Sequence, residues 1–283
     1  MAAQGRRFSR ILAILATLVV AIIALGFLYW PQIYALIEDE LIYQQKASNW
    51  RTYAAGRTLP GTPDLSDLSA RLKRQNLALG APIFMRIFKR EFELEMWVKR
   101  GGGRFELFAT YPVCMWSGGL GPKLKQGDKQ APEGFYTVDS SALNPNSQYH
   151  RSFNLGFPNA FDSTHGRTGS LLMVHGDCRS IGCYAMTNGV IDEIWSLLTA
   201  ALSAGQKRVQ VQVFPFRMTQ TNMSLHAEDP NIGFWRQLRV GYDAFVRDHV
   251  PPIVSVCEGR YTIRPATGDS DGSAPIAVSC PAT

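Results

Sequence analysis

Hydrophobic and polar side chains alternate along residues 83–109, which is the pattern of a β-strand with one buried and one polar face. Three glycines, Gly101–Gly103, interrupt the alternation and are typical of a turn. The pattern therefore predicts a β-hairpin with one solvated face. Alternate positions on that face carry glutamates, which we interpret as solvent-facing charges rather than metal ligands or catalytic acids: Glu91, Glu93 and Glu95.

Helical spacing of hydrophobic residues follows in the second half of the chain. It predicts a helix that begins with Asn188 as its N-cap and ends at Gly205, and another over residues 231–248. Residues 111–170 are rich in Gly, Pro, Asn and Ser, and we interpret them as loops that shape a groove. Together these patterns predict an α+β, mostly β, domain over residues 77–264. Further short strands are expected at 134–139, 209–213 and 253–263.

The N-terminal part of the chain has the pattern of a membrane anchor. Residues 11–30 contain no charged side chain, and a helix of this length can cross about 30 Å of hydrocarbon. Residues 1–10 carry three arginines, which favours a cytoplasmic location for that end. We therefore expect a cytoplasmic basic tail, an uncleaved transmembrane signal-anchor and a periplasmic remainder held at the inner membrane.

Segments of different character flank the expected domain. Residues 31–76 predict a juxtamembrane helical linker, made of one helix over 32–58 and a second that begins at Thr62-Pro63. Residues 265–283 are rich in Gly, Ser, Asp and Pro, a composition that predicts a disordered tail.

The charge and the cysteine content of the chain limit the classes of function that it can have. The net charge is +6, but the basic residues are scattered and form no basic and aromatic stripe, so no nucleic-acid partner is expected. The chain has five cysteines, and an odd number leaves at least one thiol unpaired in an oxidising compartment. We interpret Cys114 and Cys257 as small buried hydrophobic residues rather than as a disulfide with each other.

The candidate catalytic residues lie between Leu171 and Met186, in the sequence LLMVHGDCRSIGCYAM. A buried strand over residues 171–174 ends at His175, and Cys183 follows one loop later, just before a helix. A thiol and an imidazole held one loop apart can act as nucleophile and base. We therefore predict that Cys183 is the nucleophile and that His175 is the base that later protonates the leaving amine.

Two neighbouring residues have expected supporting roles. Gly182 leaves the backbone accessible, so its amide and that of Cys183 are the candidate donors to a developing oxyanion. Ser180 either orients the site through a side-chain hydrogen bond or is simply a turn residue.

This stretch resembles the His-Gly … Ser-x-Gly-Cys motif of the YkuD-type L,D-transpeptidases, cysteine enzymes that act on stem peptides of bacterial peptidoglycan. The similarity is greatest to the YafK-like branch of that family. It extends from Leu77 to Ile263 and includes residues 132–136 and 154–159. The resemblance implies an L,D-transpeptidase (YkuD-like) mixed β catalytic domain with flanking helices, and acyl chemistry at diaminopimelate through a thioester on Cys183.

The motif departs from the commoner YkuD pattern in a shorter loop and at two positions. Ile181 stands where a second histidine is typical, and Ala185 stands where an arginine is typical. The substrate carboxylate then requires another cation, for which Arg167 and Arg179 are the candidates. Tyr184 is also expected to contact substrate.

The resemblance leaves the acceptor of the acyl group open. An amine acceptor gives a cross-link or attaches a protein to the wall, whereas water gives hydrolysis. The short loop and missing charged groups favour hydrolysis, because a second stem peptide needs fixed groups to hold its amine in register. The expected partners are stem peptides, a wall-attached lipoprotein or outer-membrane protein, and the inner membrane.

Three alternatives use the same residues. His175, Cys178 and Cys183 offer three zinc ligands, although no fourth ligand lies nearby and no paired C-x-x-C is present. Cys178 and Cys183 are a second alternative as a redox pair, but they lack the C-x-x-C spacing. A third is a non-catalytic peptidoglycan-binding module. We expect neither a metal nor a cofactor.

Overall fold

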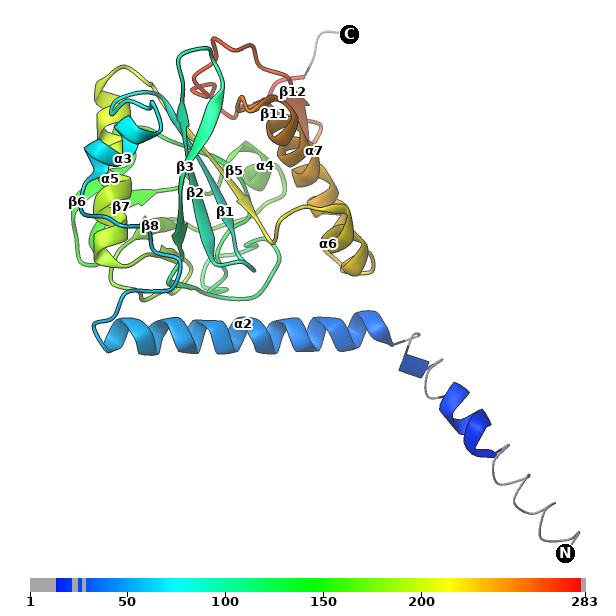
Figure 1. Ribbon diagram of the computed structural model, residues 1–283. Coiled ribbons are helices and arrows are strands. Elements are labelled where there is room, and N and C mark those ends of the chain that lie inside the picture. The colour runs from blue at the N-terminus through cyan, green and yellow to red at the C-terminus, as the bar shows by residue number, and fades with distance from the viewer. Residues whose placement is uncertain (1–13, 22–24, 27–28, 281–283) are drawn as a thin grey trace, which may run out of the picture.

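The computed structural model describes residues 14–21, 25–26 and 29–280 (Figure 1). Its centre is a five-stranded sheet with the strand order β3-β2-β1-β10-β5. β1 pairs in parallel with β10, and the other neighbours are antiparallel. The strands are β1 Ile83–Phe88, β2 Glu93–Lys99, β3 Phe105–Pro112, β5 Gly134–Val138 and β10 Val209–Phe214.

A second five-stranded sheet has the order β4-β9-β8-β7-β6. Its strands are β4 Met115–Trp116, β6 Leu143–Ser147, β7 His150–Asn154, β8 Met173–His175 and β9 Tyr184–Ala185. β11 Ile253–Cys257 and β12 Arg260–Arg264 form a separate hairpin. The helices are α2 Trp30–Ala54, α3 Leu68–Arg74, α4 Ala160–Thr164, α5 Asn188–Ser203, α6 Gln220–Leu225 and α7 Ile232–Asp248, with a 3₁₀ turn at Ser140–Ala142.

Both faces of the central sheet are buried. Successive side chains of β1 point to opposite faces, so β1 contributes to the packing on each of them. Met85 and Ile87 belong to a core that also holds α5 and the second sheet. Phe84 and Phe88 lie on the other face, where Phe84 packs 4.5 Å from Phe245 of α7 between ring centroids. The strands and the helix over 232–248 thus confirm the predicted α+β class.

The predicted solvated face of the hairpin is covered. Arg217, which follows β10, binds Glu93 at 2.5 Å and Glu95 at 2.7 Å, and Glu95 is buried. Similarly, Gln210 and Gln212 of β10 are buried, and their side chains donate to the Pro252 carbonyl and to Gln210, each at 3.0 Å. The alternation of hydrophobic and polar residues shows that a strand has two different faces, but it does not show which parts of the protein pack on each face.

Two predicted helix starts are wrong. Thr187, not Asn188, is the N-cap of α5, and the side-chain oxygen of Asn188 instead accepts a hydrogen bond from the Asp177 amide at 2.8 Å. The helix expected to begin at Thr62-Pro63 begins at Leu68. Asp67 caps it by accepting the Ala70 amide at 2.8 Å.

The C-terminal segment packs on the domain, in contrast to the predicted disordered tail. Cys280 forms a disulfide with Cys257, and the Val256 amide donates to the Ala277 carbonyl at 3.0 Å. Lys99 of β2 donates to the Ser270 carbonyl at 2.9 Å. These contacts fix residues 265–280 against β2 and β11.

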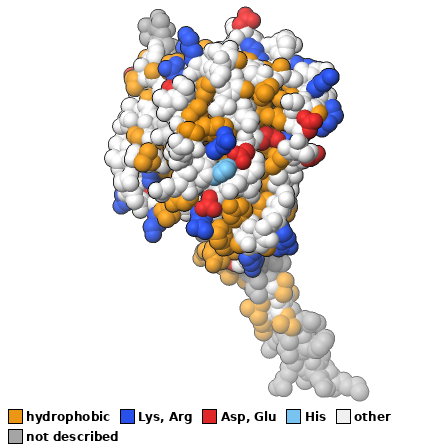
Figure 2. Space-filling model, turned by 90° about the vertical axis from the view of Figure 1, so that its left-hand side faces the viewer, with side chains coloured by type: hydrophobic (Ala, Val, Ile, Leu, Met, Phe, Trp, Pro, Cys, Tyr) orange, Lys and Arg blue, Asp and Glu red, His pale blue; other side chains and the backbone are white. Residues whose placement is uncertain are grey.

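α2 lies along the base of the domain (Figure 1) and contacts it through polar side chains. Glu38 accepts hydrogen bonds from Arg90 at 2.8 Å and His226 at 2.7 Å, and Lys46 donates to the Gly118 carbonyl at 2.8 Å. Leu36 and Leu41, which the sequence marks as apolar members of this helix, are 72% and 64% exposed. Figure 2 shows the face of the domain that carries α5, on which acidic and basic side chains are interspersed and hydrophobic side chains gather toward the base.

No helix within the described residues is both long enough and apolar enough to cross a membrane. The predicted transmembrane span over residues 11–30 includes residues 11–13, 22–24 and 27–28, which lie outside the described part of the chain, as does the basic tail over residues 1–10.

Candidate active site

The second sheet brings His175 and Cys183 close together. β8 ends at His175, and β9 begins directly after Cys183, as its parallel neighbour. His175 lies opposite Ala185, so this register places Cys183 opposite Met173. Extending the register by this one residue brings His175 and Cys183 to neighbouring positions of the sheet, with Cα atoms about 8 Å apart. Side chains can span that separation.

His175 is held as a neutral base. Its side chain is buried, and Nδ1 lies 2.6 Å from the Gly176 carbonyl. Because a carbonyl only accepts, Nδ1 carries the proton and Nε2 is the free base. Burial lowers the pKa of His175 below its usual value, although the Gly176 hydrogen bond opposes the shift. The ring of Tyr149 lies 5.0 Å away between centroids.

Cys183 rests as a thiol. Burial raises its pKa, and the Met173 amide, which donates to Sγ at 3.4 Å, only partly opposes this shift. The thiol itself donates to the Leu171 carbonyl at 3.7 Å. Both pKa shifts thus favour the uncharged forms, a thiol at Cys183 and a neutral imidazole at His175.

The loop before the nucleophile is fixed by two serines. Ser180 donates to the Cys183 carbonyl at 2.7 Å and lies 3.1 Å from Ser117 between hydroxyl oxygens. The Gly182 amide donates to the Ser117 hydroxyl. Ser180 therefore makes an orienting hydrogen bond, as one of the two sequence interpretations expects. The Gly182 amide, a predicted oxyanion donor, is already engaged, which leaves the Cys183 amide as the remaining candidate.

A pocket of about 140 Å³ opens beside this loop. It is lined by Gly182, Ile181 and residues from the irregular segment predicted to shape the groove, including Lys123 and Lys129. Lys123 is buried and pairs with Asp128 at 2.5 Å. Lys129 is exposed at the rim. The pocket therefore offers one lysine that is not held in a buried ion pair.

Two of the three predicted substrate-binding residues lie elsewhere. Arg167 forms a buried ion pair with Asp162 at 2.8 Å and stacks on aromatic rings. Tyr184 is fully buried and donates to the Pro132 carbonyl at 2.7 Å. Both side chains thus have buried partners within the domain, and their predicted contacts with substrate stay predictions. Arg179 is exposed and lies in the loop after His175, near Asp177 at 3.6 Å.

The disulfide pairing of the cysteines excludes the zinc site and the redox pair that the sequence suggested, because both of them use Cys178. Cys114 forms a disulfide with Cys178, so Cys178 is neither a free metal ligand nor the redox partner of Cys183. Cys257 pairs with Cys280, which corrects the interpretation of Cys114 and Cys257 as unpaired residues. All five cysteines are described, and Cys183 is the free one. No group of metal-binding side chains is found among the described residues.

Sequence reasoning missed several residues of the site. Ser117 and Tyr149 come from positions 66 and 26 residues before Cys183 and His175 and carry no motif. Lys129 lies in the irregular segment over residues 111–170 and also carries no motif. These residues reach the site only because the fold brings distant parts of the chain together.

The mixed α+β domain thus holds a free cysteine directly before β9 and a histidine at the end of the parallel strand β8, an arrangement suited to a cysteine nucleophile. Residues 90–213 match the family model "YkuD: L,D-transpeptidase catalytic domain". The chain is also 48% identical over 205 residues to the Escherichia coli (strain K12) protein named "Putative L,D-transpeptidase YafK", covering 72% of this chain and 82% of that protein. The chain belongs to the YkuD-type L,D-transpeptidase family, which confirms the resemblance of its motif.

Solved structures are more distant. The helical cell shape determining protein Pgp2 of Campylobacter jejuni, as its K307A mutant, is 20% identical over 66% of this chain and 68% of that chain, with a TM-score of 0.40. Bd1075 of Bdellovibrio bacteriovorus is 17% identical over 58% of this chain and 60% of that chain, with a TM-score of 0.35.

Proposed function

We propose that this protein is a peptidoglycan-remodelling cysteine enzyme that acts at diaminopimelate in stem peptides through a thioester on Cys183. The observation that supports the proposal is the pairing of β8 with β9, since the free cysteine directly precedes β9 and the histidine, with Nδ1 bonded to the Gly176 carbonyl, ends β8. Family membership supports the proposed substrate class.

The proposed reaction uses only these two side chains for proton transfer. His175 Nε2 accepts the thiol proton as Sγ of Cys183 attacks the carbonyl carbon of the scissile amide. The tetrahedral intermediate collapses, the C–N bond breaks, and the imidazolium protonates the leaving amine. The resulting thioester is then attacked by water or by an amine, whose proton His175 accepts, and the thiolate leaves and is reprotonated.

The developing oxyanion requires a donor. The Cys183 amide is the candidate, and Ser180, which holds the Cys183 carbonyl, orients that peptide segment. Losing one such donor typically costs about 2.7–4 kcal/mol of transition-state stabilisation.

We favour water as the acceptor. Ala185 is fully buried where the commoner family motif has an arginine, and Ile181 is exposed where it has a histidine. A second stem peptide would find fewer fixed charges to hold its amine, whereas water needs no such site. Release of a wall-attached lipoprotein or outer-membrane protein is the corresponding biological reaction.

We further propose that the catalytic domain is periplasmic and anchored in the inner membrane by residues 11–30. The support is the uncharged run itself and the use of four of the five cysteines in disulfides, which persist in an oxidising compartment.

The test is incubation of the purified protein with defined muropeptides and with wall fragments that carry a lysine-linked peptide, followed by mass spectrometry. The wild type is expected to release the peptide to water and to accumulate an adduct on Cys183, and Cys183→Ala is expected to do neither. Faster exchange of D-alanine for an added amine would establish transfer instead. An active Cys183→Ala variant would disprove the proposed nucleophile.

A further inference from the structure

The segment that follows His175 has an unusual backbone. Asp177 and Cys178 both adopt positive φ, at 65° and 51°, although neither is glycine. Residues with a Cβ rarely adopt this conformation, because it is sterically strained unless the surroundings hold it. Two in succession therefore require external restraints.

The restraint on Cys178 is covalent. Its disulfide with Cys114 joins the segment to the residue directly before β4, and the Cys178 amide donates to the Met186 carbonyl at 3.1 Å. Cys114 is itself tied down, because its amide donates to the Ala185 carbonyl at 2.9 Å.

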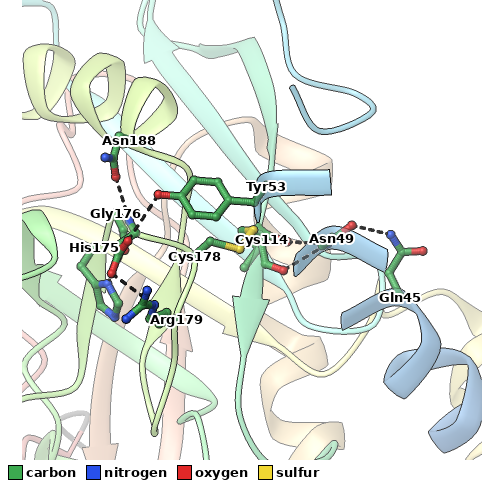
Figure 3. The surroundings of a disulfide bond; sticks show 11 residues. Gln45, Asn49, Tyr53, Cys114, His175, Gly176, Cys178, Arg179 and Asn188 are labelled. Carbon is green, nitrogen blue, oxygen red and sulfur yellow. Dashed lines mark hydrogen bonds and ion pairs between the residues drawn. A yellow bond between two sulfur atoms is a disulfide. The ribbon is translucent and has the colours of Figure 1, made fainter. Parts of the chain in front are cut away.

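α2 holds both sides of this disulfide. Asn49 is buried and donates to the Cys114 carbonyl at 3.1 Å, while the Tyr53 hydroxyl lies 3.4 Å from the Asp177 carboxylate. Figure 3 shows Asn49 on one side of the disulfide and His175 with Gly176 on the other, while the Tyr53 ring extends past the disulfide toward Gly176. The helix outside the catalytic sheets is thus connected to the residue after the histidine.

The connection ends at the catalytic base. Gly176 directly precedes the left-handed pair, and its carbonyl accepts the Nδ1 proton of His175. If residues 177 and 178 relaxed to negative φ, the Gly176 peptide would rotate and that acceptor would be lost. His175 would then no longer be confined to the tautomer with a free Nε2.

We propose that the Cys114–Cys178 disulfide, together with Tyr53 of α2, positions the His175 imidazole by holding residues 177 and 178 in the left-handed conformation. These are positioning residues, since none of them touches the reacting atoms. The inference rests on the proposed roles of His175 and Cys183 and deepens them, because it makes the active-site geometry depend on a disulfide and on α2.

The test measures alkylation of Cys183 by iodoacetamide across pH, with the modified peptide quantified by mass spectrometry. In the wild type Cys183 is the cysteine outside a disulfide, and paired substitutions leave no new thiol. The Cys114→Ala/Cys178→Ala variant is expected to react about tenfold more slowly near pH 7, because the base is no longer oriented. Its pH profile should lose the histidine limb and follow simple thiol ionisation.

Glycine separates the backbone effect from loss of the bridge. Cys114→Ala/Cys178→Gly also lacks the disulfide, but glycine adopts positive φ without steric cost, so its rate and profile should stay within about twofold of wild type. Cys257→Ala/Cys280→Ala removes the other disulfide and is the control for general destabilisation, with wild-type alkylation expected. A wild-type rate in the alanine pair, or an equally slow rate in the glycine pair, would overturn the proposal.

α2 is tested separately. Tyr53→Phe removes only the hydroxyl and is expected to slow alkylation about threefold, in line with the modest net value of one hydrogen bond. Tyr43→Phe, on an exposed position of the same helix, should have no effect. Equal rates in the two variants would exclude α2 from the mechanism. Alkylation needs no substrate, so failure to process muropeptides would count against the proposed function alone.

Discussion

At the scale of single residues, the proposed reaction depends on the protonation states of His175 and Cys183. Nδ1 of His175 carries a proton and donates it to the Gly176 carbonyl in a hydrogen bond, and burial lowers the pKa of His175. Burial also raises the pKa of Cys183. Both shifts favour the uncharged forms, so the resting pair is neutral and the histidine is available as a base at neutral pH.

The pH dependence of activity follows from this state. Protonation of His175 removes the base, so kcat/KM should fall in acid with a midpoint below the ordinary histidine value of about 6.5. A pH profile with the muropeptide substrate measures the midpoint. His175→Ala is expected to lower kcat/KM by about 10²–10⁴-fold and to remove that acid limb. A midpoint well above 6.5 would contradict a buried neutral imidazole.

Lys129 is the residue we expect to hold the substrate carboxylate. It lines the pocket beside Gly182, whereas Lys123 in the same pocket is paired with Asp128. Lys129→Ala should raise KM about tenfold with little change in kcat, since a charge-assisted hydrogen bond contributes about 1.5–3 kcal/mol. Lys129→Arg should restore most of the affinity. Lys125→Ala, a neighbouring exposed lysine that does not line the pocket, is the control, and an equal effect there would reject a specific role.

At the scale of elements, α2 docks on the domain through a buried charge cluster, in addition to the apolar side chain of Ile42, which belongs to the main core. Glu38 contacts Arg90 and His226, and the ring of His226 stacks on Phe216 with 4.2 Å between centroids. Burial alone would lower the pKa of His226, but hydrogen bonds to Glu38 and to the Asn222 carbonyl outweigh it, and the pKa is raised. α2 docking therefore includes a titratable contact.

A raised histidine pKa makes this contact stronger in acid. The stabilisation is fully present below the unfolded-state value of about 6.5 and is lost as pH rises through the higher folded-state pKa. His226→Gln should therefore reduce the free energy of unfolding more at about pH 5.5 than at about pH 9. Urea unfolding at the two pH values measures the difference. In a Glu38→Gln background the effect of His226→Gln should no longer depend on pH in this way, and a persistent dependence would assign it to other groups.

At the scale of the whole molecule, two disulfides connect distant parts of the chain. One spans 64 residues and the other 23 residues, and the second returns the C-terminal segment to β11. Such bridges restrict the unfolded chain and persist where the environment is oxidising. The two disulfides and the uncharged run over residues 11–30 agree with the proposed periplasmic location.

The proposed topology is testable in cells. A reporter fused after Thr283 that functions only outside the cytoplasm should be active, because the basic residues before the apolar run favour a cytoplasmic N-terminus. The protein should remain in membranes after a high-salt wash. A soluble periplasmic product that starts near residue 30 would show instead that the apolar run is a cleaved signal.

The sequence by itself determined the features that depend on near neighbours. Alternation at residues 92–98 predicted β2, and helical spacing predicted α7, because both patterns reflect the backbone geometry of a few adjacent residues. The motif likewise identified His175 and Cys183 as a pair, since eight residues separate them. Strands such as β6, with the sequence LNPNS, were missed because they carry no apolar alternation.

Only the tertiary structure decided which distant residues meet. Cys114 pairs with Cys178, Ser117 takes the amide of Gly182, and Tyr53 reaches Asp177, although 64, 65 and 124 residues separate them. The buried partners of Arg167 and Tyr184 likewise became known only from the fold. The physical reason is that residue type and local spacing constrain the backbone nearby, whereas burial and pairing depend on the path of the whole chain.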